Sequence, residues 1–171
     1  MTLKERYMKR LLGVMMVVVA FSQFSLFAED GPKTQFFGGL SVLSGKAVDR
    51  VQAVGWQAGV TENVNSTLGI VGDFAGQYKD GHYYEYLGGP RFHARREKTT
   101  LFGHALFGGL TAGSVASSVS GFTMGYGGGV DVVANDKTSV RLIQFDWLPT
   151  RIGGVWDKNT IRFGFGLVFG R

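Results

Sequence analysis

The 171-residue chain contains no cysteine, only three prolines and only three histidines. The absence of cysteine excludes a disulfide framework, a thiolate metal site and a lipidated N-terminal cysteine. The histidines lack the close spacing of paired metal ligands, so we expect neither a metal nor a cofactor. After residue 28, no stretch approaches the roughly 18 apolar residues that a membrane-spanning helix needs, so no such helix is expected there.

The N-terminus is organised like a secretory signal peptide. Four basic residues within the first ten positions are followed by the apolar run 11–21, and Ala28 precedes two acidic residues. This run is shorter than the about 20 residues of a transmembrane helix. We therefore expect a signal peptide over residues 1–28 and a mature domain over residues 29–171, with a signal anchor as the alternative.

The basic character of the chain belongs largely to this N-terminal segment. Residues 1–28 carry four of the 18 Lys and Arg residues and one of the 13 acidic residues, so the net charge of +5 falls to +2 in residues 29–171. A net charge this small does not indicate a nucleic-acid partner. The mature domain also holds 26 of the 27 glycines and is rich in aromatic residues, a composition typical of a tightly curved β-barrel.

The closing segment, residues 160–171, alternates between two kinds of side chain. Its odd positions from 161 to 169 are Ile, Phe, Phe, Leu and Phe, whereas its even positions are mostly glycine, with Arg162 as the one charge. A β-strand points successive side chains to opposite faces, so the pattern predicts a strand with one bulky apolar face. A face of glycines suits a narrow barrel whose bulky face contacts lipid, and a buried strand in a soluble sandwich is the alternative.

Seven further segments with this alternation precede the closing one. The expected strands cover residues 35–44, 53–63, 66–78, 82–95, 99–112, 121–134, 138–150 and 160–171. Short turns mostly alternate with longer connections, as in membrane barrels, whose short turns lie on the periplasmic side. Pro90 falls inside the fourth strand, where a proline usually either weakens the case for a strand or marks a bulge. The sequence thus predicts an all-β fold, an eight-stranded up-and-down antiparallel transmembrane β-barrel.

Four stretches, together with the closing segment, carry a resemblance to a known family. They cover residues 84–92 (Tyr-Glu-Tyr-Leu-Gly-Gly-Pro-Arg-Phe), 102–109, 127–132 and 144–147. They resemble the small eight-stranded outer-membrane β-barrels, which are similar to the transmembrane domain of outer membrane protein A and to porin-like barrels. One departure is the C-terminus, which is Phe169-Gly170-Arg171, whereas such barrels commonly end on an aromatic residue.

The resemblance implies a location and a role. It implies a non-enzymatic protein of the bacterial outer membrane, in a Gram-negative envelope, that serves membrane integrity or surface interaction. The partners that it implies are outer-membrane lipids and, during biogenesis, the export and barrel-assembly machineries. It names no extracellular partner.

Counting along the expected strands places several charged side chains on the face opposite the bulky residues. The inward charges expected to form a network are Asp73, Glu85, Arg91, Asp146 and Arg162, with Asp131, His93 and His104 on the same face. Charges inside a narrow barrel must be paired or hydrated. We therefore expect these side chains to neutralise one another and to fill the lumen. Because the last strand pairs with the first and the fourth strand lies across the barrel, we expect Arg162 to approach Glu85 through the lumen. A gated polar path, which would make the protein a narrow pore for ions or small solutes, is the alternative.

Two further alternatives remain open. A lipid-modifying outer-membrane enzyme would resemble the lipid A deacylases, whose pattern places a serine two positions after a histidine. Here the three histidines are followed at that position by Tyr, Arg and Leu, so we expect no catalytic residue. A soluble lipocalin-like binder would need its bulky residues inside and its polar residues outside.

Five aromatic residues with a polar group are candidates for the membrane interfaces. They are Trp56, Tyr78, Tyr84, Trp147 and Trp156. Trp and Tyr concentrate where a bilayer meets water, because one end of the ring is apolar and the other forms hydrogen bonds. We expect them to form aromatic girdles, with ordinary packing as the alternative for some of them.

Overall fold

A computed structural model of the chain describes residues 32–45, 51–114 and 117–170. The expected signal peptide, residues 1–28, lies outside the described residues. Within the three described ranges, no helix has the length and apolar character needed to cross a membrane.

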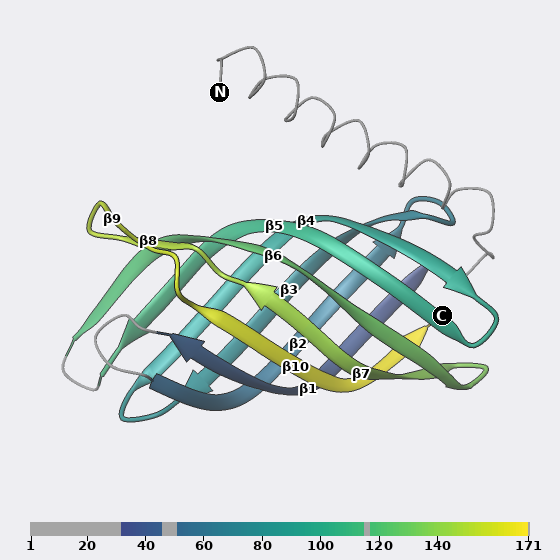
Figure 1. The fold of residues 1–171 in the computed structure, drawn as a ribbon, viewed down its shortest axis with the longest axis horizontal. Coiled ribbons are helices and arrows are strands. Elements are labelled where there is room, and N and C mark those ends of the chain that lie inside the picture. The colour runs from purple at the N-terminus through teal and green to yellow at the C-terminus, as the bar shows by residue number, and fades with distance from the viewer. Residues whose placement is uncertain (1–31, 46–50, 115–116, 171) are drawn as a thin grey trace, which may run out of the picture.

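Eight long strands close into one antiparallel barrel (Figure 1). The long strands are β1 (Thr34–Gly45), β2 (Val51–Asn63), β3 (Leu68–Tyr78), β4 (His82–Arg96), β5 (Thr99–Gly113), β6 (Ser118–Asn135), β7 (Thr138–Trp147) and β10 (Ile161–Gly170). Two three-residue strands, β8 (Thr150–Ile152) and β9 (Val155–Asp157), lie between β7 and β10 in the chain. Each long strand pairs with the next long strand along the chain, and β10 pairs with β1 to close the ring. The fold predicted from the sequence, an eight-stranded up-and-down antiparallel barrel, is confirmed.

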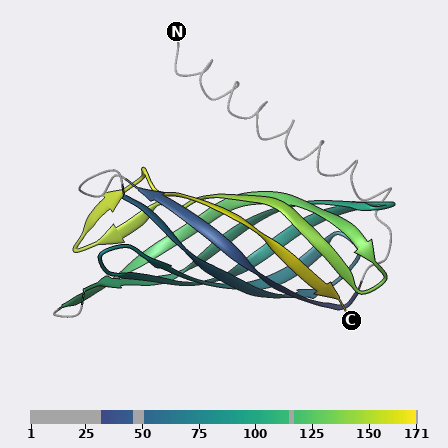
Figure 2. The same ribbon diagram turned by 90° about the horizontal axis from the view of Figure 1, so that it is seen from below.

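The two ends of the barrel differ in their connections. The turn end, at the right of Figure 1, carries the short turns β2–β3, β4–β5 and β6–β7 and the C-terminus of β10. The loop end carries the other four connections, including the long segment between β7 and β10. Figure 2 shows the strands crossing the long axis of the barrel at a slant, which ring closure requires. In the β2–β3 turn, Asn65 Oδ1 accepts hydrogen bonds from the backbone N–H groups of Thr67 (2.9 Å) and Leu68 (2.8 Å).

The segment after β7 differs from the prediction. The expected strand 138–150 ends at Trp147, and Thr150 instead begins the small β8–β9 hairpin, in which β8 pairs with β6. Pro149 has no N–H to donate to a continuing ladder. Gly153 and Gly154 make the two-residue turn with φ values of 57° and 86°, which glycine adopts without steric cost.

Strand β4 continues through Pro90 without the bulge that this proline could mark. Gly88 pairs with Phe107 and Arg91 pairs with His104 in the same register, so the chain passes Pro90 without an extra residue. The ladder with β5 is only interrupted there, because proline lacks the donor. A register shift occurs instead in β7, where Leu142 and Ile143 both face outward, 58% and 47% exposed.

Side chains on the long strands face as the alternation predicts, apart from this shift and a second one near the end of β6, between Val133 and Asn135. In β10, Phe163, Phe165 and Leu167 are exposed, whereas Arg162 and Val168 are buried inside the barrel. Large apolar side chains are exposed on all eight long strands. The outer wall is therefore apolar, and the polar residues lie in the lumen.

The lumen has an apolar part as well as a polar one. Its apolar cluster consists of Leu43, Ala53, Val71, Leu87, Leu106 and Leu148, with Tyr83 packed against it. Leu43, Ala53 and Leu148 lie near the loop end, where β1 ends, β2 begins and β7 has just ended. Leu87 and Leu106 lie in the middle of β4 and β5, so the cluster extends from the loop end into the middle of the lumen, which side chains are expected to fill in a barrel of eight strands.

Candidate functional site: the charge network in the lumen

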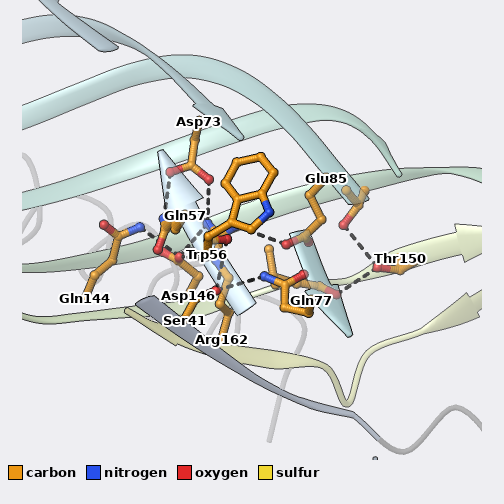
Figure 3. A network of polar contacts seen from close by, with 12 residues as sticks. Ser41, Trp56, Gln57, Asp73, Gln77, Glu85, Gln144, Asp146, Thr150 and Arg162 are labelled. Carbon is orange, nitrogen blue, oxygen red and sulfur yellow. Dashed lines mark hydrogen bonds and ion pairs between the residues drawn. The ribbon is translucent and has the colours of Figure 1, made fainter. Parts of the chain in front are cut away.

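Arg162 on β10 lies at the centre of a group of three carboxylates (Figure 3). Its guanidinium donates to Asp73 Oδ1 (2.7 Å), to Glu85 Oε2 (3.0 Å) and to Asp146 Oδ2 (2.7 Å from Nη2). These carboxylates come from β3, β4 and β7, so a single side chain connects four strands across the lumen. All four residues are buried, and Arg162 has no exposed surface.

Two glutamines and a histidine add contacts to two of the three carboxylates. Gln57 Nε2 donates to Asp73 Oδ2 (2.7 Å), and Gln144 Nε2 donates to Asp146 Oδ2 (2.9 Å). His104 Nε2 lies 2.7 Å from Asp146 Oδ1. A carboxylate buried away from water is stable only when hydrogen bonds and opposite charge replace its hydration. Asp73 and Asp146 are therefore better compensated than Glu85, whose Oε1 has no hydrogen-bond partner among the described residues.

A second centre lies closer to the turn end, around Asp131 on β6. Arg141 Nε and Nη2 donate to its two oxygens (2.7 and 3.0 Å), and Arg91 Nη2 donates to Oδ2 (3.1 Å). Arg91 Nη1 also donates to Thr61 Oγ1 (3.2 Å). The two-point contact of Arg141 is the stronger geometry, because it matches the planar fork of guanidinium to both carboxylate oxygens.

The two arginines of this centre also stack on aromatic rings. The Arg91 and Arg141 guanidinium carbons lie 3.9 and 4.4 Å from the centroid of the Phe102 ring, and Arg141 lies 4.1 Å from that of Phe37. Cations over a ring face are attracted by its negative face, an effect that grows when water is excluded. A side chain at Gly129 would overlap the Phe102 ring, so the glycine makes room for this stack.

Gln144 joins the two centres into one network. Its Oε1 accepts a hydrogen bond from Arg141 Nη1 (2.7 Å), while its Nε2 bonds to Asp146. The joined network holds Arg91, Arg141 and Arg162 against four carboxylates, with His104 beside one of them. Its charges are therefore nearly balanced, and they extend from the middle of the lumen towards the turn end.

The structure places all five residues named from the sequence in the lumen, but it divides them between the two centres. Asp73, Glu85 and Asp146 surround Arg162, and the approach of Arg162 to Glu85 across the barrel is present. Arg91 contacts none of these three carboxylates and pairs with Asp131. The sequence could not assign these pairs, because they depend on the stagger between strands that are distant in the chain.

Arg141 is the main residue that sequence reasoning missed. Strict alternation counted back from Gln144 places Arg141 outward, but the extra residue at Leu142 and Ile143 returns it to the lumen. Two large apolar residues in succession, directly after an arginine, were the available signal. Arg95 was also missed; it is buried and donates to Ser66 O (3.1 Å).

The network contains one histidine, His104, which lies beside a carboxylate. Among the described residues, no group of three or more His, Asp and Glu side chains is arranged to hold a metal ion. His104 contacts Asp146, whose oxygens also accept from Arg162 and Gln144. A general base needs a nucleophile within hydrogen-bond reach, and the recorded side-chain contact of His104 goes to this carboxylate.

All five aromatic candidates lie towards the loop end of the outer wall, so the expectation that they mark both membrane interfaces was wrong for the turn end. Trp56 Nε1 donates to Tyr78 Oη (3.3 Å), and the Tyr78 and Tyr84 hydroxyls are 3.2 Å apart. Gly76 lies beneath them, because a Cβ there would come within 2.8 Å of Trp56 Nε1. On another part of the wall, Trp147 Nε1 donates to the Lys158 carbonyl (2.8 Å).

Comparisons with solved structures identify the same architecture in other barrels. Neisserial surface protein A aligns with a TM-score of 0.65 and 10% identity, over 84% of this chain and 100% of that chain. The N-terminal β-barrel domain of Pseudomonas aeruginosa OprF aligns with a TM-score of 0.59 and 8% identity, over 83% and 100%. Ail, the attachment invasion locus protein of Yersinia pestis, solved with the heparin analogue sucrose octasulfate, aligns with a TM-score of 0.53 and 18% identity, over 82% and 100%.

These likenesses concern the fold. No protein-family model and no curated protein matches the sequence. The resemblance to small eight-stranded outer-membrane β-barrels, recognised in the sequence, is thus confirmed as a likeness of fold.

Proposed function

We propose that the chain is a non-enzymatic β-barrel of the bacterial outer membrane, with a lumen closed by its own side chains, that serves membrane integrity or surface interaction. The observation that carries this proposal is the inverted distribution of side chains. Charged residues such as Arg162 are wholly buried inside, whereas residues such as Ile70 (61% exposed) and Phe165 (49% exposed) cover the outside.

Apolar side chains outside and charged side chains inside are the distribution expected of a barrel surrounded by lipid. Soluble proteins rarely expose contiguous apolar patches of more than a few hundred Å², yet here apolar side chains are exposed on every long strand. In lipid, a closed barrel also satisfies the backbone groups of its long strands, because each pairs on both sides. A soluble lipocalin-like binder would require the opposite facing.

The packing of side chains in the lumen favours a closed barrel over a pore. Leu106, Leu110 and Leu148 are at most 1% exposed inside the barrel, and Arg91, Arg141 and Arg162 are at most 4% exposed. An ion crossing the lumen would have to displace these buried side chains and break the contacts of the arginines. A steady current would require an open water path, and barrels of eight strands are normally filled by side chains.

An enzymatic role lacks a supporting site. The side-chain hydrogen bond of His104 goes to a carboxylate that an arginine and a glutamine also bind.

The names of two structural neighbours, a surface protein and an attachment invasion locus protein, motivate surface interaction as one form of the proposed role.

Membrane fractionation tests the proposal. The full chain is expressed in a Gram-negative host, and the outer-membrane fraction is washed with urea and run on gels with and without boiling. We expect the protein to remain in the washed membranes and to migrate differently after boiling, because a folded barrel resists the detergent until heated. Recovery in the soluble fraction, with one mobility in both samples, would reject the membrane barrel.

A further inference from the structure

The β8–β9 hairpin continues the barrel wall beyond the end of β7, where β8 pairs with β6 and buried contacts hold it in place. The Thr123 and Thr150 hydroxyls are 3.0 Å apart, and Thr123 Oγ1 also donates to Pro149 O (3.3 Å). Thr150 Oγ1 donates in turn to Leu148 O (3.1 Å). Both threonines are buried, so this contact fixes the start of β8 to β6. The hairpin is thus a defined part of the barrel surface.

Arg151 occupies the middle of the outward face of this hairpin. It pairs with Phe122 on β6 and with Trp156 on β9, so the three side chains form a row on one face. The Phe122 and Trp156 rings meet edge to face with centroids 6.5 Å apart. Both rings are about two-fifths exposed (42% and 41%), and Arg151 is exposed. The row therefore presents an exposed cation beside two aromatic rings that contact each other.

Lys158 extends this surface towards β7. The Trp147 indole N–H donates to its carbonyl, which fixes the chain after β9 beside the polar edge of the indole. The Trp147 ring lies 6.0 Å from the Tyr126 ring on the outer wall. Tryptophan and tyrosine on the outside of a barrel mark the level of the lipid headgroups. Lys158 is therefore placed at that level.

The positive charges of this surface are uncompensated within the described part of the chain. Neither Arg151 nor Lys158 forms an ion pair with any described residue. The neighbouring acid, Asp157, pairs with Thr150 on the opposite face of the hairpin. Its carboxylate accepts hydrogen bonds from Asn159 N (2.9 Å) and Thr160 Oγ1 (3.1 Å).

We propose that this surface binds the phosphate of an anionic lipid in the membrane leaflet at the loop end. The hairpin patch consists of Phe122, Trp147, Arg151, Trp156 and Lys158. The inference rests on the proposed function, because it requires the barrel to span a membrane. Arginine binds phosphate oxygens in a two-point contact and lysine adds a point charge. The rings lie where the glycerol region and the first acyl carbons of such a lipid would pack.

The test compares two lipids that differ in headgroup charge. The refolded barrel in uncharged detergent is titrated with phosphatidylglycerol or with phosphatidylcholine while tryptophan fluorescence is recorded. Two of the three tryptophans lie in the hairpin patch, so the signal reports on it. We expect about 30-fold tighter binding of phosphatidylglycerol, since each basic residue near an anionic headgroup contributes about fivefold. Inorganic phosphate at the same concentration should not displace the lipid.

Matched variants decide the outcome. In Arg151→Gln/Lys158→Gln, the preference for phosphatidylglycerol should fall to within about twofold. In Lys79→Gln/Lys137→Gln, which removes the same charge from two turns, it should be unchanged. An equal preference in both double variants, or displacement by inorganic phosphate, would overturn the inference. Gel mobility with and without boiling is measured for every variant: a folded barrel without lipid preference rejects the patch alone, whereas a chain that never folds into membranes rejects the proposed function.

Discussion

Arg162 shows why a single side chain can determine whether this barrel is stable. It occupies the point where three carboxylates meet, and each of them depends on it for charge compensation. Removing one partner of a buried ion pair is costly because the remaining charge is neither hydrated nor paired. By contrast, Asp131 is held by two arginines, so it keeps one if the other is lost.

This difference predicts an order of stabilities. Arg162→Ala should lower the free energy of unfolding by about 3–5 kcal/mol, since it leaves three buried carboxylates without their cation. Arg91→Ala should cost less, about 1–3 kcal/mol, because Arg141 still binds Asp131. Unfolding by urea in detergent micelles measures both variants, with the exposed Lys98→Ala, expected within about 0.5 kcal/mol of wild type, as control. An Arg91→Ala loss equal to or above that of Arg162→Ala would show that the two centres have been ranked wrongly.

Substitutions at two adjacent residues of β10 test which face of this strand contacts lipid. Phe165→Arg should prevent stable insertion into lipid vesicles, because a charge on the lipid face near mid-membrane costs about 2–4 kcal/mol. Gly164→Ser, one position away, should still insert but with lower stability, since an added Cβ would contact the Gln57 side chain that binds Asp73. Heat-dependent gel mobility after vesicle refolding distinguishes them. Normal insertion of Phe165→Arg would mean that this face does not contact lipid.

At the scale of the element, β7 departs most from a regular strand. Its extra residue sends Leu142 and Ile143 to the same side and Arg141 to the lumen. A bulge of this kind strengthens the local twist and redirects side chains. The lumen gains the two-point contact of Arg141 with Asp131 as a result.

The bulge yields a prediction that strict alternation would not make. Leu142→Arg should impair insertion into vesicles, because Leu142 faces outward although it lies two positions from the inward Gln144. Leu142→Ala, which stays apolar, should insert normally. If Leu142→Arg inserted as well as Leu142→Ala, the side chain would face the lumen and the shift in register would be absent.

Some of the strands could be predicted from the sequence alone and others could not. The alternation in β10 and β6 is regular, so both the strands and their facing could be predicted. The β8–β9 hairpin could not be separated from strand 138–150, although Pro149 and the pair Gly153-Gly154 mark its limits. Three-residue strands carry too few side chains for their period to be recognised.

At the scale of the whole molecule, the sequence predicted most residues of the lumen and the approach of Arg162 to Glu85, but not the other pairs. Facing follows from local alternation, whereas contact across a barrel depends on the stagger of all the strands together. Arg162 and Glu85 are 77 residues apart in the chain, yet they lie 3.0 Å apart in the lumen. A single extra residue in β7 was enough to conceal Arg141 from a strict count.

The central claim is that the wall faces lipid while the lumen is closed to ions, and conductance across a planar lipid bilayer tests it most directly. The refolded protein is inserted, its incorporation is confirmed by heat-dependent mobility of the recovered sample, and the current is recorded under a constant voltage. We predict an inserted barrel with no steady current above that of the empty bilayer. A steady current proportional to voltage would contradict the claim, because the leucines and the arginine centres would then leave an open path.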